Sequence, residues 1–246
     1  GIIFDTDVDR AGAVANDGKE LNRNRLIALI SAVLLEEHPG TTIVTDSITS
    51  SGLAAFIAQK GGVHHRFKRG YKNVIDESIR INKSGKDSQL AIETSGHGAL
   101  KENYFLDDGA YLITKLLIKM AQLRKENRTL FSLIDSLAEP AESEEVRMNI
   151  LVPEFAAYGS GVLKDLADYA AKENWDVAKE NYEGLRVSFG AGQGDGWFLL
   201  RMSLHDPLMP LNIESNSIGG VHQIAEKLYA FLRGYDKLET SGLKGL

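Results

Sequence analysis

The sequence contains no cysteine in 246 residues, which excludes disulfide bonds and thiolate metal sites. Any metal must be held by carboxylates, carbonyls or histidines, and the composition suits a reducing compartment, either the cytoplasm or an organelle such as a plastid. An excess of positive charge is also missing. The formal net charge is −6, whereas binding along a nucleic-acid backbone needs a clustered positive field. No apolar run approaches the roughly 20 residues of a membrane span, and the start shows no signal-peptide pattern, so we expect neither nucleic acid nor a membrane as a partner.

The remaining composition is that of ordinary globular protein. The chain is 43% hydrophobic and 25% charged, which is enough for one large domain or two modest ones. Its first four residues, GIIF, predict a buried strand that begins without any lead-in. This abrupt start suggests a fragment or a processed product of a longer protein.

The pattern along the chain predicts two regions of different architecture. In the first region, helical and strand patterns alternate, which is typical of an α/β fold. We expect helices there over 22–37, 53–59, 73–82 and 111–126, and strands over 42–45, 64–67 and 89–93. The acidic, proline-bearing stretch PAESEE at 140–145 is the predicted linker. Beyond it, an α+β domain is predicted from strands over 146–151, 185–189, 197–201 and 211–215 and helices over 162–173 and 221–233.

Three aspartates stand at alternate positions after the first apolar run, in the stretch FDTDVDR. In extended chain, Asp5, Asp7 and Asp9 would share one side, where a hard divalent cation usually relieves their mutual repulsion. A calcium EF-hand does not fit, because Arg10 and Asn16 stand where that loop needs glycine and glutamate. Magnesium is therefore the expected metal, with a plain acidic turn as the alternative.

A second polar cluster, ETSGHG, follows the last strand predicted in the first region. Glu93, Ser95 and His97 can exchange hydrogen bonds with sugar hydroxyls, and the glycines let a ligand approach the backbone. A polyol is the natural ligand, and a polar loop without a ligand is the alternative. The acidic pair Asp107 and Asp108 is interpreted as the start of the next helix, whose dipole it opposes.

Two basic segments are candidate anion sites. Arg201 and Ser203, at the end of a predicted strand, have the chemistry to grip a phosphate, although an arginine there is more often a surface ion pair. The stretch HHRFKRGYK at 64–72 either attracts a phosphorylated substrate or is a solvated edge strand protected by its charges.

The order and spacing of the three polar motifs resemble the α-D-phosphohexomutases, the phosphoglucomutase and phosphomannomutase enzymes, over residues 1–234. The family's loops read D-x-D-x-D-R for the metal, E-x-S-G-H for the sugar and R-x-S-(N/G)-T-E-P for the phosphate. The phosphate loop departs from this pattern at Leu204, His205 and Asp206. The resemblance implies α/β/α mixed-sheet domains followed by an α+β C-terminal domain. It divides the chain into the end of metal-binding domain 2 (1–40), sugar-binding domain 3 (41–139) and phosphate-binding domain 4 (146–246).

The family's catalytic serine loop, usually T-A-S-H-N-P, does not occur in these residues. The resemblance therefore implies a missing N-terminal domain that carries the serine. With it, the implied activity is transfer of a phosphoryl group from phosphoserine to a hexose 1-phosphate or 6-phosphate of glucose or mannose. A hexose 1,6-bisphosphate serves as activator and intermediate.

The resemblance also implies a role for each matching residue. Mg²⁺ on the three aspartates and the adjacent arginine would stabilise the transferring phosphoryl group. The implied residues are Asp5, Asp7 and Asp9 for the metal, Arg10 for catalysis, Glu93, Ser95 and His97 for the sugar, and Arg201 and Ser203 for the distal phosphate. The general base is sought among Lys68, Lys72 and His97.

Two other classes of protein remain open. In a phosphatase of the haloacid-dehalogenase type, the first aspartate of an Asp-x-Asp pair after a strand is the nucleophile, which would be Asp5. A non-catalytic, mutase-like binding protein would keep the fold without turnover, and the altered phosphate loop favours that idea.

Overall fold

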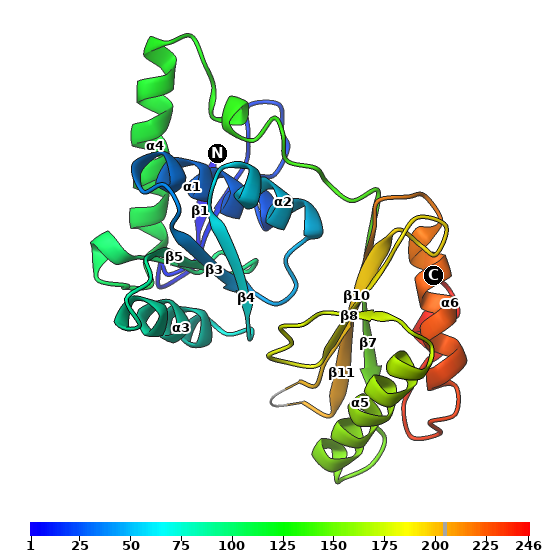
Figure 1. The fold of residues 1–246 in the computed structure, drawn as a ribbon. Coiled ribbons are helices and arrows are strands. Elements are labelled where there is room, and N and C mark those ends of the chain that lie inside the picture. The colour runs from blue at the N-terminus through cyan, green and yellow to red at the C-terminus, as the bar shows by residue number, and fades with distance from the viewer. Residues whose placement is uncertain (204–205) are drawn as a thin grey trace. The chain divides into compact units, whose positions relative to one another are not determined.

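The computed structural model describes residues 1–203 and 206–246, so Leu204 and His205 of the atypical phosphate loop lie outside the described residues. The chain divides into two compact units, Gly1–Ala138 and Glu139–Leu246 (Figure 1). Each unit has a hydrophobic core of its own. The finer division expected at residue 40 stays a prediction.

A four-stranded mixed sheet forms the centre of the first unit. Its order is β4 (Val63–Phe67), β3 (Thr42–Asp46), β5 (Ser88–Ile92) and β6 (Gly98–Leu100). Strand β3 is parallel to both β4 and β5, and β6 runs antiparallel to β5. The helices are α1 (Asn24–Glu37), α2 (Ser51–Gln59), α3 (Tyr71–Lys83) and α4 (Gly109–Lys125). The predicted α/β class is confirmed, and β6 is a strand that the sequence pattern did not reveal.

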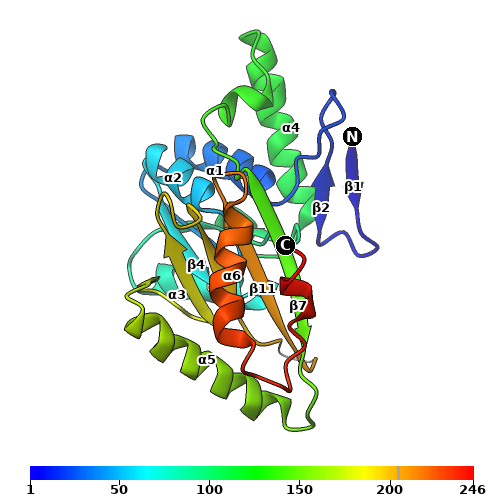
Figure 2. The same ribbon diagram turned by 90° about the vertical axis from the view of Figure 1, so that its right-hand side faces the viewer.

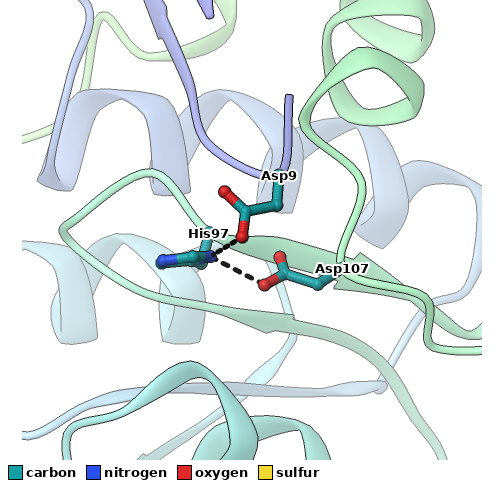
Figure 3. A group of neighbouring side chains, drawn as sticks. All are labelled: Asp9, His97 and Asp107. Carbon is teal, nitrogen blue, oxygen red and sulfur yellow. Dashed lines mark hydrogen bonds and ion pairs between the residues drawn. The ribbon is translucent and has the colours of Figure 1, made fainter. Parts of the chain in front are cut away.

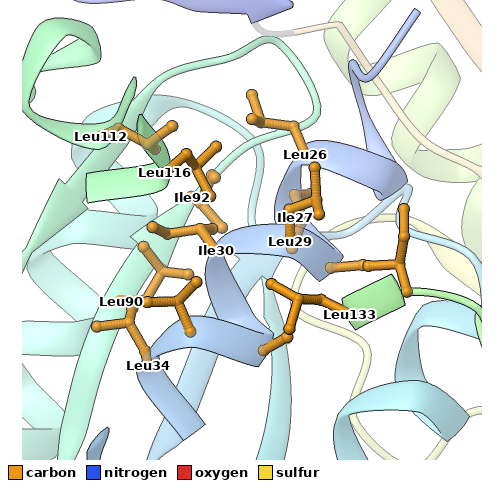
Figure 4. Close-up of a cluster of buried hydrophobic side chains, with 14 of the residues drawn as sticks. Leu26, Ile27, Leu29, Ile30, Leu34, Leu90, Ile92, Leu112, Leu116 and Leu133 are labelled. Carbon is orange, nitrogen blue, oxygen red and sulfur yellow. The ribbon is translucent and has the colours of Figure 1, made fainter. Parts of the chain in front are cut away.

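Helices cover both faces of this sheet, because the side chains of β3 and β5 alternate between two apolar layers. Ile43, Leu90 and Ile92 pack into the core formed with α1, α2 and α4. Figure 4 shows Leu90 and Ile92 among side chains of α1 and α4. Val44 and Ala91 pack on the opposite face with residues of α3. Since β3 and β5 are parallel, their carboxyl ends lie at the same edge of the sheet, and the polar loops that follow them are brought together there.

A separate two-stranded antiparallel ribbon consists of β1 (Ile2–Phe4) and β2 (Ala11–Ala13). Residues 5–10 connect these strands and are called the metal loop here, after their predicted role. All of β1 is exposed, with Ile3 at 67%, so the prediction of a buried strand here is wrong. An apolar run is buried only where a second layer covers it, and within the described residues β1 pairs with β2 alone.

The second unit is a five-stranded antiparallel sheet with helices packed on it, which confirms the predicted α+β class; β8 is a strand that the sequence pattern did not reveal. The strand order is β7 (Glu142–Asn149), β11 (Leu208–Ser215), β10 (Gly196–Leu200), β9 (Leu185–Phe189) and β8 (Asp176–Val177). Helices α5 (Phe155–Lys172) and α6 (Gly220–Leu232) contribute to one core with the sheet, and Figure 2 shows α6 lying along β11. In the described part of the chain, no helix combines the length and apolar character needed to cross a membrane.

The predicted linker at 140–145 is wrong from Glu142 onward, because β7 begins there. The strand pairs with β11 along its whole length. As an edge strand it keeps most of its acidic side chains in solvent, which hides the apolar alternation that a strand normally shows. Glu142 also accepts hydrogen bonds from the amides of Gly219 and Val221 at the start of α6.

Candidate active site

The three aspartates of the metal loop converge through a turn. Residues 5–9 leave the strand conformation, and Val8 has a φ of +64°, so the expectation of a continuous extended chain is wrong. Even so, one carboxylate oxygen from each of Asp5, Asp7 and Asp9 lies within 4.8 Å of the others. The turn therefore gathers the same three side chains that the alternation predicted.

Arg10 binds the first of these aspartates. Its backbone N donates to Oδ1 of Asp5 at 3.1 Å, and its Nε donates to Oδ2 at 2.5 Å. Partial burial raises the pKa of Asp5, but the hydrogen bonds and charge of Arg10 outweigh that effect and hold the pKa below its usual value. The predicted catalytic arginine thus lies in direct contact with a predicted metal ligand.

The donor set fits a hard divalent cation. All three ligands are carboxylates, and among the described residues the buried Oδ1 of Asp9 has no hydrogen-bond partner. Burial raises the pKa of Asp9; His97 lowers it, and Asp7 and Asp5 raise it further. A cation between these oxygens would remove the repulsion that makes the cluster unfavourable by itself.

The ETSGHG motif at residues 93–98, called the sugar loop after its predicted role, begins directly after β5. Glu93 is buried, and its Oε1 accepts a hydrogen bond from the backbone N of Gly70 at 2.6 Å. Its Oε2 accepts from Oγ of Ser95 at 3.2 Å. Glu93 therefore joins the sugar loop to the loop between β4 and α3.

The metal loop and the sugar loop meet in the structure, although almost 90 residues separate them in sequence. Backbone N of Ala11 donates to the carbonyl of Gly96 at 3.2 Å, and Arg10 forms a bridge with His97. Nδ1 of His97 lies 3.7 Å from Oδ2 of Asp9 (Figure 3). The structure thus places the predicted metal and sugar residues in one site.

The acidic pair Asp107 and Asp108 has two different roles, so the interpretation of both as a helix start is only half right. Asp108 is the N-cap of α4 and accepts from the backbone N of Tyr111 at 2.8 Å. Oδ2 of Asp107 instead lies 2.7 Å from Nδ1 of His97. Burial raises the pKa of Asp107, and His97 acts against that rise.

Asp46, the last residue of β3, is a further polar residue at this edge that the sequence analysis missed. Its carboxylate has no exposed surface and accepts from Oγ1 and N of Thr94 at 2.7 and 3.3 Å. Nε of Arg69 lies 3.5 Å away. Burial raises the pKa of Asp46 to about 6, with Glu93 adding to the rise and Thr94 and Arg69 opposing it. Through Thr94 and Arg69, Asp46 thus connects the sugar loop with the loop between β4 and α3.

Of the basic stretch 64–72, residues 64–67 lie on β4, an edge strand of the sheet, residues 68–70 form the next loop, and residues 71–72 begin α3. The edge position agrees with one of the two interpretations, but residues 64–67 are half-buried and not solvated. His64 is bonded to Oγ1 of Thr45, and Arg66 donates to the carbonyls of Thr49 and Ser50. His65 is bonded to the buried Glu77. These side chains therefore support the fold, and the role predicted for Lys68 stays a prediction.

In the second unit, Arg201 and Ser203 closely follow the end of β10 at Leu200. Backbone N of Arg201 donates to the carbonyl of Pro210, and N of Ser203 donates to that of Leu208. Oγ of Ser203 accepts from the backbone N of Asp206 at 3.2 Å. The two predicted phosphate ligands thus both bond through their backbones to β11, and their role in binding stays a prediction.

Comparison with known proteins gives a consistent result. Residues 22–140 match the family model described as phosphoglucomutase/phosphomannomutase, alpha/beta/alpha domain III. The chain is 30% identical over 235 residues to a phosphoglucomutase of Neisseria gonorrhoeae, covering 94% of this chain and 47% of the relative. It is 29% identical over 235 residues to a phosphomannomutase/phosphoglucomutase of Pseudomonas syringae, covering 95% of this chain and 46% of the relative.

A solved structure gives the same result. A phosphoglucomutase/phosphomannomutase family protein of Burkholderia thailandensis matches with a TM-score of 0.75 and 27% identity, covering 95% of this chain and 46% of that one. Residues 22–140 therefore form a domain III of the phosphoglucomutase/phosphomannomutase family, and the similarity to proteins of this family extends over nearly the whole chain. It spans about half the length of the relatives that it matches.

Proposed function

We propose that this chain supplies the metal, sugar and phosphate sites of a phosphohexomutase that interconverts hexose 1-phosphate and hexose 6-phosphate, with glucose or mannose as the sugar. The observation that carries the proposal is the meeting of the metal loop and the sugar loop at Arg10, Ala11, Gly96 and His97. The relatives named above are mutases of this type. The phosphoserine would come from a region outside these residues, in keeping with relatives of about twice this length.

Each group has a chemical task in this proposal. Asp5, Asp7 and Asp9 would hold Mg²⁺, which when bound neutralises charge on the phosphoryl group in transfer. Arg10 stabilises the same charge from the adjacent position in the loop. The remaining residues bind substrate, with Glu93 and Ser95 on sugar hydroxyls and Arg201 and Ser203 on the distal phosphate.

The proton transfer is assigned to His97, which lies beside the metal loop. In the forward half-reaction a sugar hydroxyl oxygen bonds to phosphorus, the bond from phosphorus to the serine oxygen breaks, and the hydroxyl proton moves to Nε2 of His97. The serine oxygen then takes up a proton from solvent. After the bisphosphate has turned over in the site, the serine oxygen bonds to its other phosphorus and releases that proton, the bond from this phosphorus to the sugar oxygen breaks, and the sugar oxygen takes up the proton held by His97. Hexose 1,6-bisphosphate is thus both an intermediate and an activator.

The test is a coupled mutase assay on the protein purified from its source, compared with the Asp7→Ala variant. Loss of one of three carboxylates should lower kcat by about 10²-fold or more, because the metal acts on the transition state. Asp76→Ala is the control, since Asp76 is an exposed carboxylate of α3. Full activity of Asp7→Ala would refute the metal assignment.

The phosphatase alternative is less well supported. Both carboxylate oxygens of Asp5 accept hydrogen bonds from Arg10, which stabilise the carboxylate and so lower its nucleophilicity. The relatives named above also carry mutase names. If the protein is a mutase-like binding protein without turnover, the wild type and every variant would show no mutase activity, even with all substrates present.

A further inference from the structure

The ring of His97 is held on two sides in the described structure. Nδ1 lies 2.7 Å from Oδ2 of Asp107, and the ring of Tyr71 stacks on it with centroids 5.0 Å apart and an interplanar angle of 22°. We propose that Asp107 is a positioning residue that keeps the proton of neutral His97 on Nδ1 and leaves Nε2 as the atom that acts on the substrate. The catalytic part of this inference rests on the proposed function, but the tautomer itself does not.

The orientation of Asp107 is fixed independently of His97. Its Oδ1 accepts a hydrogen bond from the backbone N of Gly98 at 3.1 Å, so its Oδ2 is directed at the imidazole. An ionised carboxylate can only accept, and a bond of 2.7 Å to it requires a proton on Nδ1. Neutral imidazole carries one N–H, so Nε2 then holds a lone pair.

The position of Nε2 agrees with a role in proton transfer to or from a bound substrate. Figure 3 shows that the second ring nitrogen of His97 points away from both Asp9 and Asp107. The stacked Tyr71 ring limits rotation of the imidazole, and Tyr71 follows Gly70, whose amide is bonded to Glu93 of the sugar loop. Nε2 is therefore the ring nitrogen left to meet a ligand that Glu93 and Ser95 hold.

The same three residues also permit a competing interpretation. Single ligand atoms of Asp9, His97 and Asp107 lie within 4.8 Å of one another, which is a spacing that a metal ion can use. A metal on Nδ1 would displace the proton and break the bond to Asp107. The two interpretations therefore predict different states of Nδ1.

The tautomer can be read from long-range ¹H–¹⁵N spectra of the ¹⁵N-labelled 246-residue chain, without added metal and at a pH where His97 is neutral. We expect the wild type to show a pyrrole-type Nδ1 and a pyridine-type Nε2. Addition of Mg²⁺ should leave that pattern in place. A proton on Nε2 in the wild type, or loss of the Nδ1–H pattern when Mg²⁺ is added, would overturn the proposal.

Asp107→Asn is the matching variant, because an asparagine can donate its own amide proton to Nδ1 and so favours the opposite tautomer. Asp108→Asn is the control. Asp108 is the neighbouring carboxylate, and it caps α4 instead of contacting His97. We expect the tautomer to switch in Asp107→Asn and to stay unchanged in Asp108→Asn. An unchanged tautomer in Asp107→Asn would contradict the proposal, and the wild-type spectrum decides the matter if that variant does not fold.

Activity of the intact protein gives the second readout. Asp107→Asn should lower kcat by about 10²-fold or more with little change in KM, since it alters proton transfer and leaves the sugar contacts in place. Asp108→Asn should keep both thermal stability and kcat near the wild-type values, because asparagine caps a helix about as well as aspartate. An equal loss of kcat in both variants would show that Asp107 has only a structural role, and this would contradict the proposal. Absence of mutase activity in the wild type would refute the proposed function and leave the tautomer result intact.

Discussion

At the scale of single residues, the least expected group is the carboxyl of Asp46. It has no exposed surface, and Thr94 and Arg69 hold it between two loops. Burial raises its pKa from 3.8 to about 6. A folded-state pKa above the unfolded value means that the protonated group favours the folded state, and that this advantage is lost as the pH rises through about 6.

The Asp46→Asn variant removes this titration. We expect the unfolding free energy of the wild type, minus that of the variant, to decrease by about 3 kcal/mol between about pH 3.5 and about pH 7. Urea titrations followed through amide signals of β3 and β5 would measure it. A difference that does not change with pH would show that Asp46 does not titrate in this range.

Glu77→Gln is the matched control, because Glu77 is also a buried carboxylate of the first unit. Hydrogen bonding from Arg80 lowers the pKa of Glu77 in spite of its burial. The sign is therefore reversed: the contribution of Glu77 is present above its unfolded pKa of 4.5 and is lost as the pH falls through the folded value.

Arg201 allows a test of the phosphate loop. Arg201→Ala should raise KM for hexose 1-phosphate by about 10-fold to 100-fold, the range expected for loss of a charged hydrogen bond, with a smaller effect on kcat. Steady-state kinetics of the intact protein would measure both constants. Arg147→Ala is the control, since Arg147 lies in β7 with its side chain 70% exposed. Equal KM values for Arg201→Ala and wild type would show that Arg201 does not bind the substrate phosphate.

At the scale of elements, two glycines let the metal loop pass close to its neighbours. A Cβ on Gly109, the first residue of α4, would lie 2.8 Å from the carbonyl carbon of Arg10 and 3.0 Å from the carbonyl oxygen of Val8. A Cβ on Gly96 would lie 2.6 Å from the carbonyl oxygen of Ala11, and Gly96 also has a φ of +102°. The conflicting atoms are backbone atoms, so they cannot move aside as a flexible side chain would.

Gly109→Ala should therefore weaken Mg²⁺ binding several-fold and destabilise the first unit by about 1–3 kcal/mol, because the added methyl displaces the metal loop. Titration calorimetry with Mg²⁺ and thermal unfolding would measure the two effects. Gly161→Ala in α5 is the control, since its Cβ would meet nothing within 4 Å. The control should be neutral or slightly stabilising. Wild-type Mg²⁺ affinity in Gly109→Ala would refute the close approach.

The elements also show what the sequence could predict. The central strands and long helices follow from their apolar period. The candidate metal and sugar residues were found from short motifs whose members are only a few positions apart. The roles of Asp46 and Asp107 could not be predicted, because they depend on pairing with Thr94 and His97 across 48 and 10 residues. The strand character of Glu142 was hidden because an edge strand needs little apolar alternation.

At the scale of the whole molecule, the chain consists of two units with separate cores. Both tryptophans, Trp175 and Trp197, belong to the second unit, so tryptophan fluorescence reports on that unit alone. We expect residues 139–246, produced alone, to unfold in urea at nearly the midpoint found by fluorescence for the full 246 residues. A large loss of stability in the isolated unit would show that the two units fold as one cooperative body.

The central claim is that this chain is part of a mutase that works through phosphoserine. The most direct test is to incubate the protein purified from its source with glucose 1,6-bisphosphate and Mg²⁺, and to map the acquired phosphate by mass spectrometry. The account predicts phosphate on a serine outside residues 1–246 and none on the metal loop. An acyl phosphate on Asp5 would contradict it and identify a phosphotransferase of the haloacid-dehalogenase type.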